Sequence, residues 1–91
     1  MEKIEQDAIA ERLELIPEWS QNGEALQRTI SFDDFASAMG FVNAVADLAE
    51  RRQHHPDILI RYNKVTLTLT THDAGGLTSS DFDSAAAIDA I

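Results

Sequence analysis

One long segment, residues 35–52, limits most strongly what this chain can fold into. Between residues 35 and 49, apolar side chains cover far more than a narrow stripe of the expected helix, and Gly40, Asn43, Asp47 and Glu50 form a thin polar row. A helix that is apolar nearly all round is buried on more than one side. In a chain of 91 residues, one small sheet can cover one side, and little is left to cover another. The segment therefore predicts a helix that packs on a sheet and on a partner subunit, in a homodimer or homotetramer.

The residues after this segment fix where the helix stops. His54-His55 is followed by Pro56, which ends a helix and pushes the residue before it into an extended conformation. Beyond the proline, residues 58–62 are expected to form a strand, Asn63-Lys64 a turn, and residues 65–71 a second strand.

The second of these strands alternates cleanly between apolar and hydroxyl side chains. Val65, Leu67 and Leu69 are expected to face the core, while the threonines between them face away from it. If the strand stays regular, His72 lies on the threonine side.

The N-terminal part predicts a helix over residues 5–15, which Pro17 stops. Asn22-Gly23 is a hairpin signal, and residues 25–30 alternate as a strand. Two helix starts follow similar rules: Ser31 as N-cap with Asp34 at the third helical position, and Thr78 as N-cap with Asp81 there. The matching hydrophobic staples would be Ile30–Phe35 and Leu77–Phe82.

These elements predict an α+β fold in a single domain, residues 1–91. A first helix is followed by two hairpin–helix units, which gives a four-stranded antiparallel sheet with helices packed on one face. The last helix is expected to continue to Ile91.

Composition excludes several function classes. The net charge of −9 disfavours nucleic-acid and anionic-membrane binding, because phosphate contacts need Lys and Arg. The absence of cysteine removes disulfides and thiolate metal sites. No apolar run approaches twenty residues and no leader is visible, so the expected location is the cytoplasm.

All three histidines lie between Glu50 and Asp81. Imidazole exchanges a proton near neutral pH, so His54, His55 and His72 with Asp81 could form an acid–base site where element ends meet. Two other interpretations stay open. The adjacent histidines could be solvated residues at a helix C-terminus. Three histidines and an aspartate could also bind zinc, although adjacent histidines seldom both point at one ion.

The order of these residues resembles one family, the pterin-4a-carbinolamine dehydratases. The series that carries the resemblance is Glu50, His54, His55, Pro56, Tyr62, His72 and Asp81. Further similar positions are Trp19, Phe35, Phe41, Val45-Ala46, Asn63-Lys64-Val65, Thr71 and Gly75-Gly76-Leu77-Thr78.

The resemblance implies a small α+β subunit, dimeric or tetrameric, that dehydrates a 4a-hydroxy-tetrahydropterin and so recycles tetrahydrobiopterin. It implies His54, His55 and His72 as catalytic residues, without metal or cofactor, since the pterin is the substrate. It implies an aromatic amino acid hydroxylase as a pathway partner. Supporting or substrate-binding roles would fall to Glu50, Asp81, Pro56, Trp19 and Thr71.

A second interpretation is an interaction protein. Some members of the resembled family bind a transcription regulator through the helix that forms their tetramer, and the apolar segment 35–49 would serve that role. An intact histidine series favours retained enzyme chemistry, because a pure adaptor has no need of it. A third interpretation is a different, pterin-like substrate in the same site.

Overall fold

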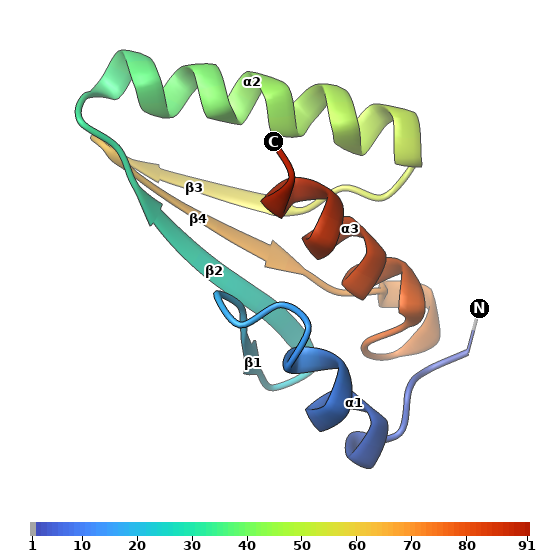
Figure 1. The fold of residues 1–91 in the computed structure, drawn as a ribbon. Coiled ribbons are helices and arrows are strands. Elements are labelled where there is room, and N and C mark those ends of the chain that lie inside the picture. Colours follow the sequence, from blue (N-terminus) through green and yellow to red (C-terminus); the bar gives the residue numbers. More distant parts are fainter. Residues whose placement is uncertain (1) are drawn as a thin grey trace.

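The computed structural model describes residues 2–91 as a sheet with helices on one face (Figure 1). The elements in chain order are α1 (Gln6–Leu13), β1 (Ser20–Asn22), β2 (Ala25–Ser31), α2 (Phe35–Arg52), β3 (Asp57–Arg61), β4 (Lys64–Leu69), the 3₁₀ turn η1 (His72–Ala74) and α3 (Ser79–Asp89). No helix among residues 2–91 combines the length and the apolarity that a membrane span requires.

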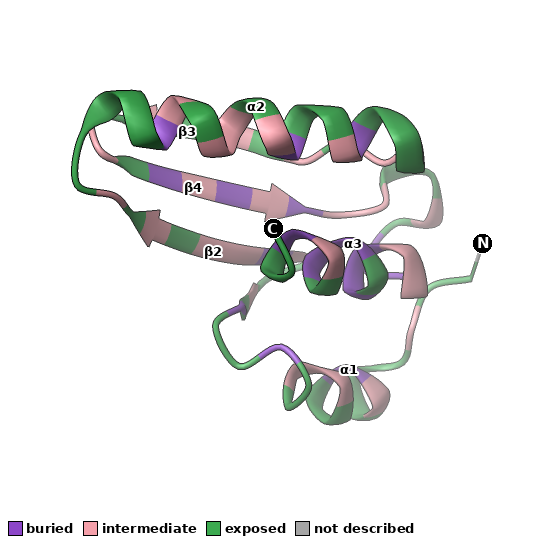
Figure 2. Ribbon diagram, turned by 45° about the horizontal axis from the view of Figure 1, so that its top comes forward, coloured by how far each residue is buried: buried purple, intermediate pink, exposed green. Residues whose placement is uncertain are grey.

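The four strands form one antiparallel sheet in the order β1-β2-β4-β3, so β4 is central and β3 lies at an edge. The predicted alternation along β4 is confirmed: Val65, Leu67 and Leu69 are fully buried under the helices (Figure 2). On the opposite face, Thr29 and Leu59 are exposed. The α+β class and the placement of the helices on one face are thus confirmed.

The core lies between the sheet and the helices. Leu26 of β2 and the buried side of β4 pack with one face of α2 and with α3, whose capping residues are themselves buried. Trp19, between α1 and β1, is also buried, and its Nε1 donates a hydrogen bond to Asp89 Oδ1 at 2.8 Å. The link between Trp19 and Asp89 fastens the C-terminal end of α3 to the start of the sheet.

The start of α2 differs from the sequence prediction. The N-cap is Asp34, whose Oδ1 accepts from Ser37 N at 2.7 Å, and Ser31 is the last residue of β2. Ser31 pairs with Lys64 in the sheet, so strand pairing holds its backbone in an extended conformation and delays the helix. Phe35 becomes the first helical residue and is 48% exposed, so the predicted staple with Ile30 is wrong.

Both hairpin loops lie one residue from their predicted positions: the first is one residue later than Asn22-Gly23, and the second is one residue earlier than Asn63-Lys64. Asn22 pairs with Ala25 and Arg61 pairs with Lys64, so the two-residue loops are Gly23-Glu24 and Tyr62-Asn63. The first loop position has positive φ in each case, +62° at Gly23 and +54° at Tyr62. Glycine adopts this backbone without cost, whereas a bulky aromatic side chain rarely does.

The helices at the two ends of the chain are shorter than predicted. α1 begins at Gln6 and ends at Leu13, after which the chain makes a turn before Pro17. α3 ends at Asp89 instead of reaching Ile91. Its start is as predicted, because the Thr78–Asp81 capping box is present and both Leu77 and Phe82 are buried.

The strand before His72 also ends early. β4 stops at Leu69, and Thr71 forms an isolated bridge with Gly76. The Oγ1 of Thr70 donates to Glu24 O at 2.6 Å, which is a side-chain contact that replaces the next strand pairing. His72 therefore does not continue the threonine face of β4, as a regular strand would require, but begins η1.

Candidate active site

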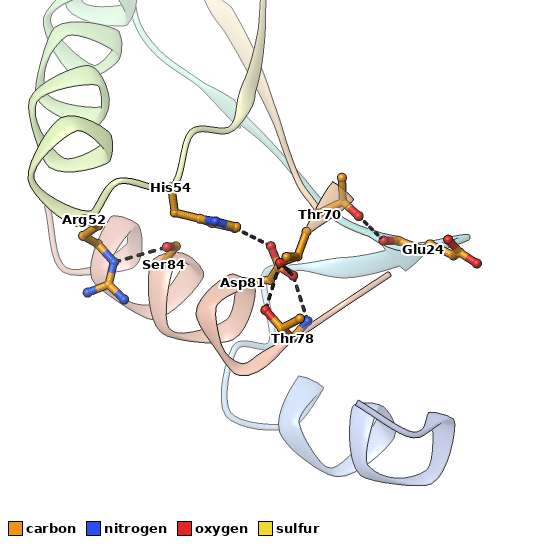
Figure 3. A network of polar contacts seen from close by, with 8 residues as sticks. Glu24, Arg52, His54, Thr70, Thr78, Asp81 and Ser84 are labelled. Carbon is orange, nitrogen blue, oxygen red and sulfur yellow. Dashed lines mark hydrogen bonds and ion pairs between the residues drawn. The ribbon is translucent and has the colours of Figure 1, made fainter. Parts of the chain in front are cut away.

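His54 lies where α2 has ended and β3 has not begun. Gln53 caps α2 in the left-handed conformation, and the backbone N–H of His54 donates to Ala49 O at 3.2 Å. The imidazole then points away from α2 toward the start of α3 (Figure 3). There its Nε2 lies 2.6 Å from Asp81 Oδ1, and the His54 side chain is 13% exposed. Because α2 ends before Pro56, the side chain of His54 can reach this nearly buried position.

Asp81 is fully buried and accepts hydrogen bonds on both carboxylate oxygens. Its Oδ2 accepts from Thr78 N at 2.9 Å and from Thr71 Oγ1 at 2.8 Å, while Oδ1 faces His54 (Figure 3). The hydroxyls of Thr71 and Thr78 are 2.8 Å apart. A buried carboxylate is costly unless it is hydrogen-bonded, and this one has a partner on each oxygen.

This network determines which nitrogen of His54 is free. An ionised carboxylate only accepts, so His54 must donate its Nε2–H to Asp81. The Nδ1 atom then carries the lone pair of the neutral ring, or a second N–H in the cation. No buried side-chain polar atom among residues 2–91 lacks a hydrogen-bond partner, and Nδ1 has none, so it is reachable from solvent. His54 can therefore accept or deliver a proton at Nδ1.

An open cleft of about 370 Å³ lies beside His54. It contains charged, amide and hydroxyl groups from the end of α2, from η1 and from the first turn of α3. The residues that line it are Arg52, Gln53, His54, Thr71, Asp73, Ala74 and Ser80. Of the predicted site residues, His54 and Thr71 line this cleft. Asp81 does not line it, but is hydrogen-bonded to both of them.

The other predicted residues lie elsewhere around the site. His55 is exposed and pairs through Nε2 with Glu50 Oε2, also exposed. His72 is exposed, does not line the cleft, and makes no side-chain hydrogen bond within residues 2–91, although its neighbours Thr71 and Asp73 line the cleft. Pro56 lines a small apolar recess on another side of His54. Trp19 is bound to Asp89, at the opposite end of α3 from Asp81.

Sequence reasoning missed several residues of the cleft. Arg52 and Gln53 precede His54 directly, and Asp73 and Ser80 are the neighbours of His72 and Asp81, but the sequence pattern predicts no site role for these four residues. Their closeness in sequence to His54, His72 and Asp81 was the available signal. In the described part of the chain, no three His, Cys, Asp or Glu side chains are grouped as metal ligands would be.

Comparison with known proteins gives a consistent result. A family model described as Pterin 4 alpha carbinolamine dehydratase matches residues 2–91. A protein of Acidobacterium capsulatum is 53% identical over 91 residues, which covers 100% of this chain and 99% of the relative. A protein of Thermomicrobium roseum is 54% identical over 81 residues, or 89% of this chain and 87% of the relative. Both carry the provisional name pterin-4-alpha-carbinolamine dehydratase.

Two solved structures extend the comparison. A transcriptional coactivator/pterin dehydratase from Brucella melitensis superposes with a TM-score of 0.92 at 33% identity, covering 97% of this chain and 96% of the other. A pterin dehydratase-like protein described as a RuBisCO assembly factor in the alpha-carboxysome has a TM-score of 0.69 at 28% identity, covering 80% and 87%. With the sequence matched from residue 2 to residue 91, the chain belongs to the pterin-4-alpha-carbinolamine dehydratase family.

Proposed function

We propose that this protein eliminates water from a 4a-hydroxy-tetrahydropterin to give the quinonoid dihydropterin. The single observation that carries the proposal is the His54–Asp81 pair beside an open cleft, in a chain that belongs to this family. The proposed role is the recycling of a tetrahydropterin, in the cytoplasm, for an aromatic amino acid hydroxylase.

The reaction requires two proton transfers. The C4a–O bond breaks and the hydroxyl leaves as water after it gains a proton. The proton on N5 is removed as the C4a=N5 double bond forms. A positioned side chain typically contributes a hundred- to ten-thousand-fold to each such step, as an order of magnitude.

His54 is suited to remove the proton from N5. Its Nδ1 is free, and Asp81 behind Nε2 orients the ring and balances the charge that the ring acquires, as an aspartate does behind a catalytic histidine elsewhere. The hydroxyl would receive its proton from His72, whose neighbours in the sequence, Thr71 and Asp73, both line the cleft. His55, paired with Glu50 on the surface, would act near the mouth of the site.

The test is a dehydration assay with synthetic 4a-hydroxy-tetrahydropterin, followed by ultraviolet absorbance. Purified protein should accelerate the spontaneous dehydration. Activity should persist after exhaustive treatment with chelator, since neither cysteines nor a His-x-x-x-His spacing is present to bind zinc. If the protein does not accelerate dehydration, the dehydratase proposal is refuted. If chelator abolishes the activity and added zinc restores it, the metal-free mechanism is refuted.

A second candidate function is that of an interaction protein that binds a transcription regulator through α2. The observation that favours it is the apolar side chain of Phe35, exposed at the start of α2, in a helix whose buried residues are only Ala38, Val45 and Ala49. One structural neighbour is described as a transcriptional coactivator as well as a pterin dehydratase. A catalytically dead His54→Ala/His72→Ala protein should keep any such binding, whereas a charged substitution at Phe35 should remove it.

A further inference from the structure

Two charged side chains of the cleft, Arg52 and Asp73, have no role in the proton transfers above. Both line the cleft beside His54. They carry opposite charges but form no ion pair with each other within residues 2–91. Opposite charges that face one cleft without pairing offer a ligand both a strong donor and a strong acceptor.

The position of Arg52 is fixed by the neighbouring helix. Its Nε donates to Ser84 Oγ at 3.2 Å, and Ser84 is 3% exposed in the packed face of α3 (Figure 3). A guanidinium has five N–H groups in one plane, so four remain after this bond. The terminal nitrogens of Arg52 have no hydrogen-bond partner in the described chain, and Arg52 is one of the residues that line the cleft.

Asp73 is positioned by the same network that holds His54. It is the middle residue of η1, which is closed by Ala74 N donating to Thr71 O at 3.2 Å and by Gly75 N donating to His72 O at 3.1 Å. Thr71 in turn is bound to Asp81. The carboxylate of Asp73 makes no side-chain hydrogen bond or ion pair within residues 2–91, so it is available as an acceptor.

We infer that Arg52 and Asp73 recognise the amino-oxo edge of the pterin ring, an inference that rests on the proposed function. This edge carries two donors, the 2-amino group and N3–H, next to one acceptor, the C4 carbonyl oxygen. Asp73 accepts from the donors, and Arg52 donates to the carbonyl oxygen. Because C4 is bonded to C4a, a guanidinium that holds the carbonyl oxygen brings the reacting carbon toward His54, two residues away in the chain. Arg52 and Asp73 are thus positioning residues that select 2-amino-4-oxo pterins.

The test measures binding apart from turnover. The variants are Arg52→Met and Asp73→Asn, with Arg51→Met and Asp83→Asn as controls, since Arg51 and Asp83 are exposed and lie outside this cleft. The probes are an oxidised, non-reacting pterin and its 2-oxo analogue, titrated by fluorescence, together with kcat and KM for the 4a-hydroxy substrate.

Arg52→Met should raise the pterin Kd and the KM by roughly 10- to 100-fold, which is the range for a hydrogen bond to a charged group, without a matching fall in kcat. Asp73→Asn should remove the preference for pterin over the 2-oxo analogue. The controls should behave as the wild type does. Unchanged pterin affinity in Arg52→Met and unchanged preference in Asp73→Asn would overturn the inference. If the wild-type protein binds the oxidised pterin but does not dehydrate the 4a-hydroxy substrate, the proposed function is overturned instead. The binding measurements on the variants would still test the roles of Arg52 and Asp73.

Discussion

Asp81 belongs to two structures at once, the capping box of α3 and the hydrogen-bond network that orients His54. The sequence predicts both roles, a capping residue at a helix start and a carboxylate of the acid–base site, but not its burial. In the structure it is fully buried, and removing it leaves the Thr71 hydroxyl and the Thr78 N–H without their acceptor. The cost of an unsatisfied buried group then adds to the lost cap.

Asp81→Ala should therefore lower the free energy of unfolding by about 1–3 kcal/mol, the cost of leaving a buried polar group unpaired. Activity should fall as well, because His54 loses its orienting partner. Urea denaturation measures the first effect. Asp83→Ala removes an exposed carboxylate of the same helix and should change stability by less than about 0.5 kcal/mol. Equal effects of the two substitutions would contradict this account.

The three histidines should contribute unequally to the turnover rate. His54→Ala and His72→Ala should each lower kcat by about a hundred-fold or more if each transfers one proton. His55→Ala should have a smaller effect, because its ring pairs with Glu50 at the surface. A folded His54→Ala/His72→Ala protein that turns over at nearly the wild-type rate would show that these side chains are not catalytic.

The N-cap of α2 predicts an acid-dependent stability. A hydrogen bond from the backbone N–H of Ser37 lowers the pKa of Asp34 below its usual value. Since the folded pKa lies below the unfolded pKa of about 3.9, the stabilising contribution is complete above that pH and is lost as the pH falls through the folded pKa.

Asp34→Asn keeps a capping side chain but cannot titrate, so its free energy of unfolding should depend less steeply on pH below about 4 than the wild type's does. Thermal melts between acidic and neutral pH measure this slope. Asp33→Asn removes the same charge one residue away, outside the N-cap position, and serves as the control. A slope equally reduced in both variants would assign the effect to net charge.

At the scale of elements, the glycines in a turn and in a helix should respond in opposite directions to the same substitution. Gly23 has φ of +62° in the β1–β2 loop, whereas Gly40 lies inside α2, where an added Cβ meets nothing within 4 Å. Gly23→Ala should lower the free energy of unfolding by roughly 1 kcal/mol, because the left-handed backbone is unfavourable for alanine. Gly40→Ala should raise it by roughly 0.5–1 kcal/mol.

Differential scanning calorimetry at matched concentrations tests this pair. Stabilisation by Gly23→Ala would contradict the turn geometry. Destabilisation by Gly40→Ala would indicate that this part of α2 is covered by another subunit, since the single chain leaves it exposed.

For the whole molecule, the expected state is a homodimer or homotetramer. Phe35 of α2 is 48% exposed, and β3 is an edge strand with an exposed Leu59. A small domain with such surface commonly gains stability by association. Sedimentation at micromolar concentration should show an assembly, and Phe35→Glu should weaken it, with the acidic side chain tolerated at a helix start.

Leu15→Glu is the matched control, because Leu15 is 83% exposed after α1, distant in the chain from α2 and β3. It should leave the assembly intact. A monomeric wild type, or equal dissociation by both substitutions, would refute the prediction that α2 lies at the interface.

The sequence by itself determined the features that depend on neighbouring residues. The alternation of Val65, Leu67 and Leu69 defined the buried side of β4, and the Thr78–Asp81 spacing defined the start of α3. Pro56 separated α2 from β3. Each of these depends on backbone geometry and side-chain periodicity within a few residues, which the order of the amino acids encodes directly.

Only the tertiary structure decided which distant groups meet. His54 and Asp81 are 27 residues apart, and Arg52 and Ser84 are 32 apart, and both pairs depend on how α3 packs beside the end of α2. The strand register assigned Ser31 to β2, although its local sequence suits an N-cap equally well. Such contacts result from burying the shared core and from pairing every strand, and no local pattern specifies them.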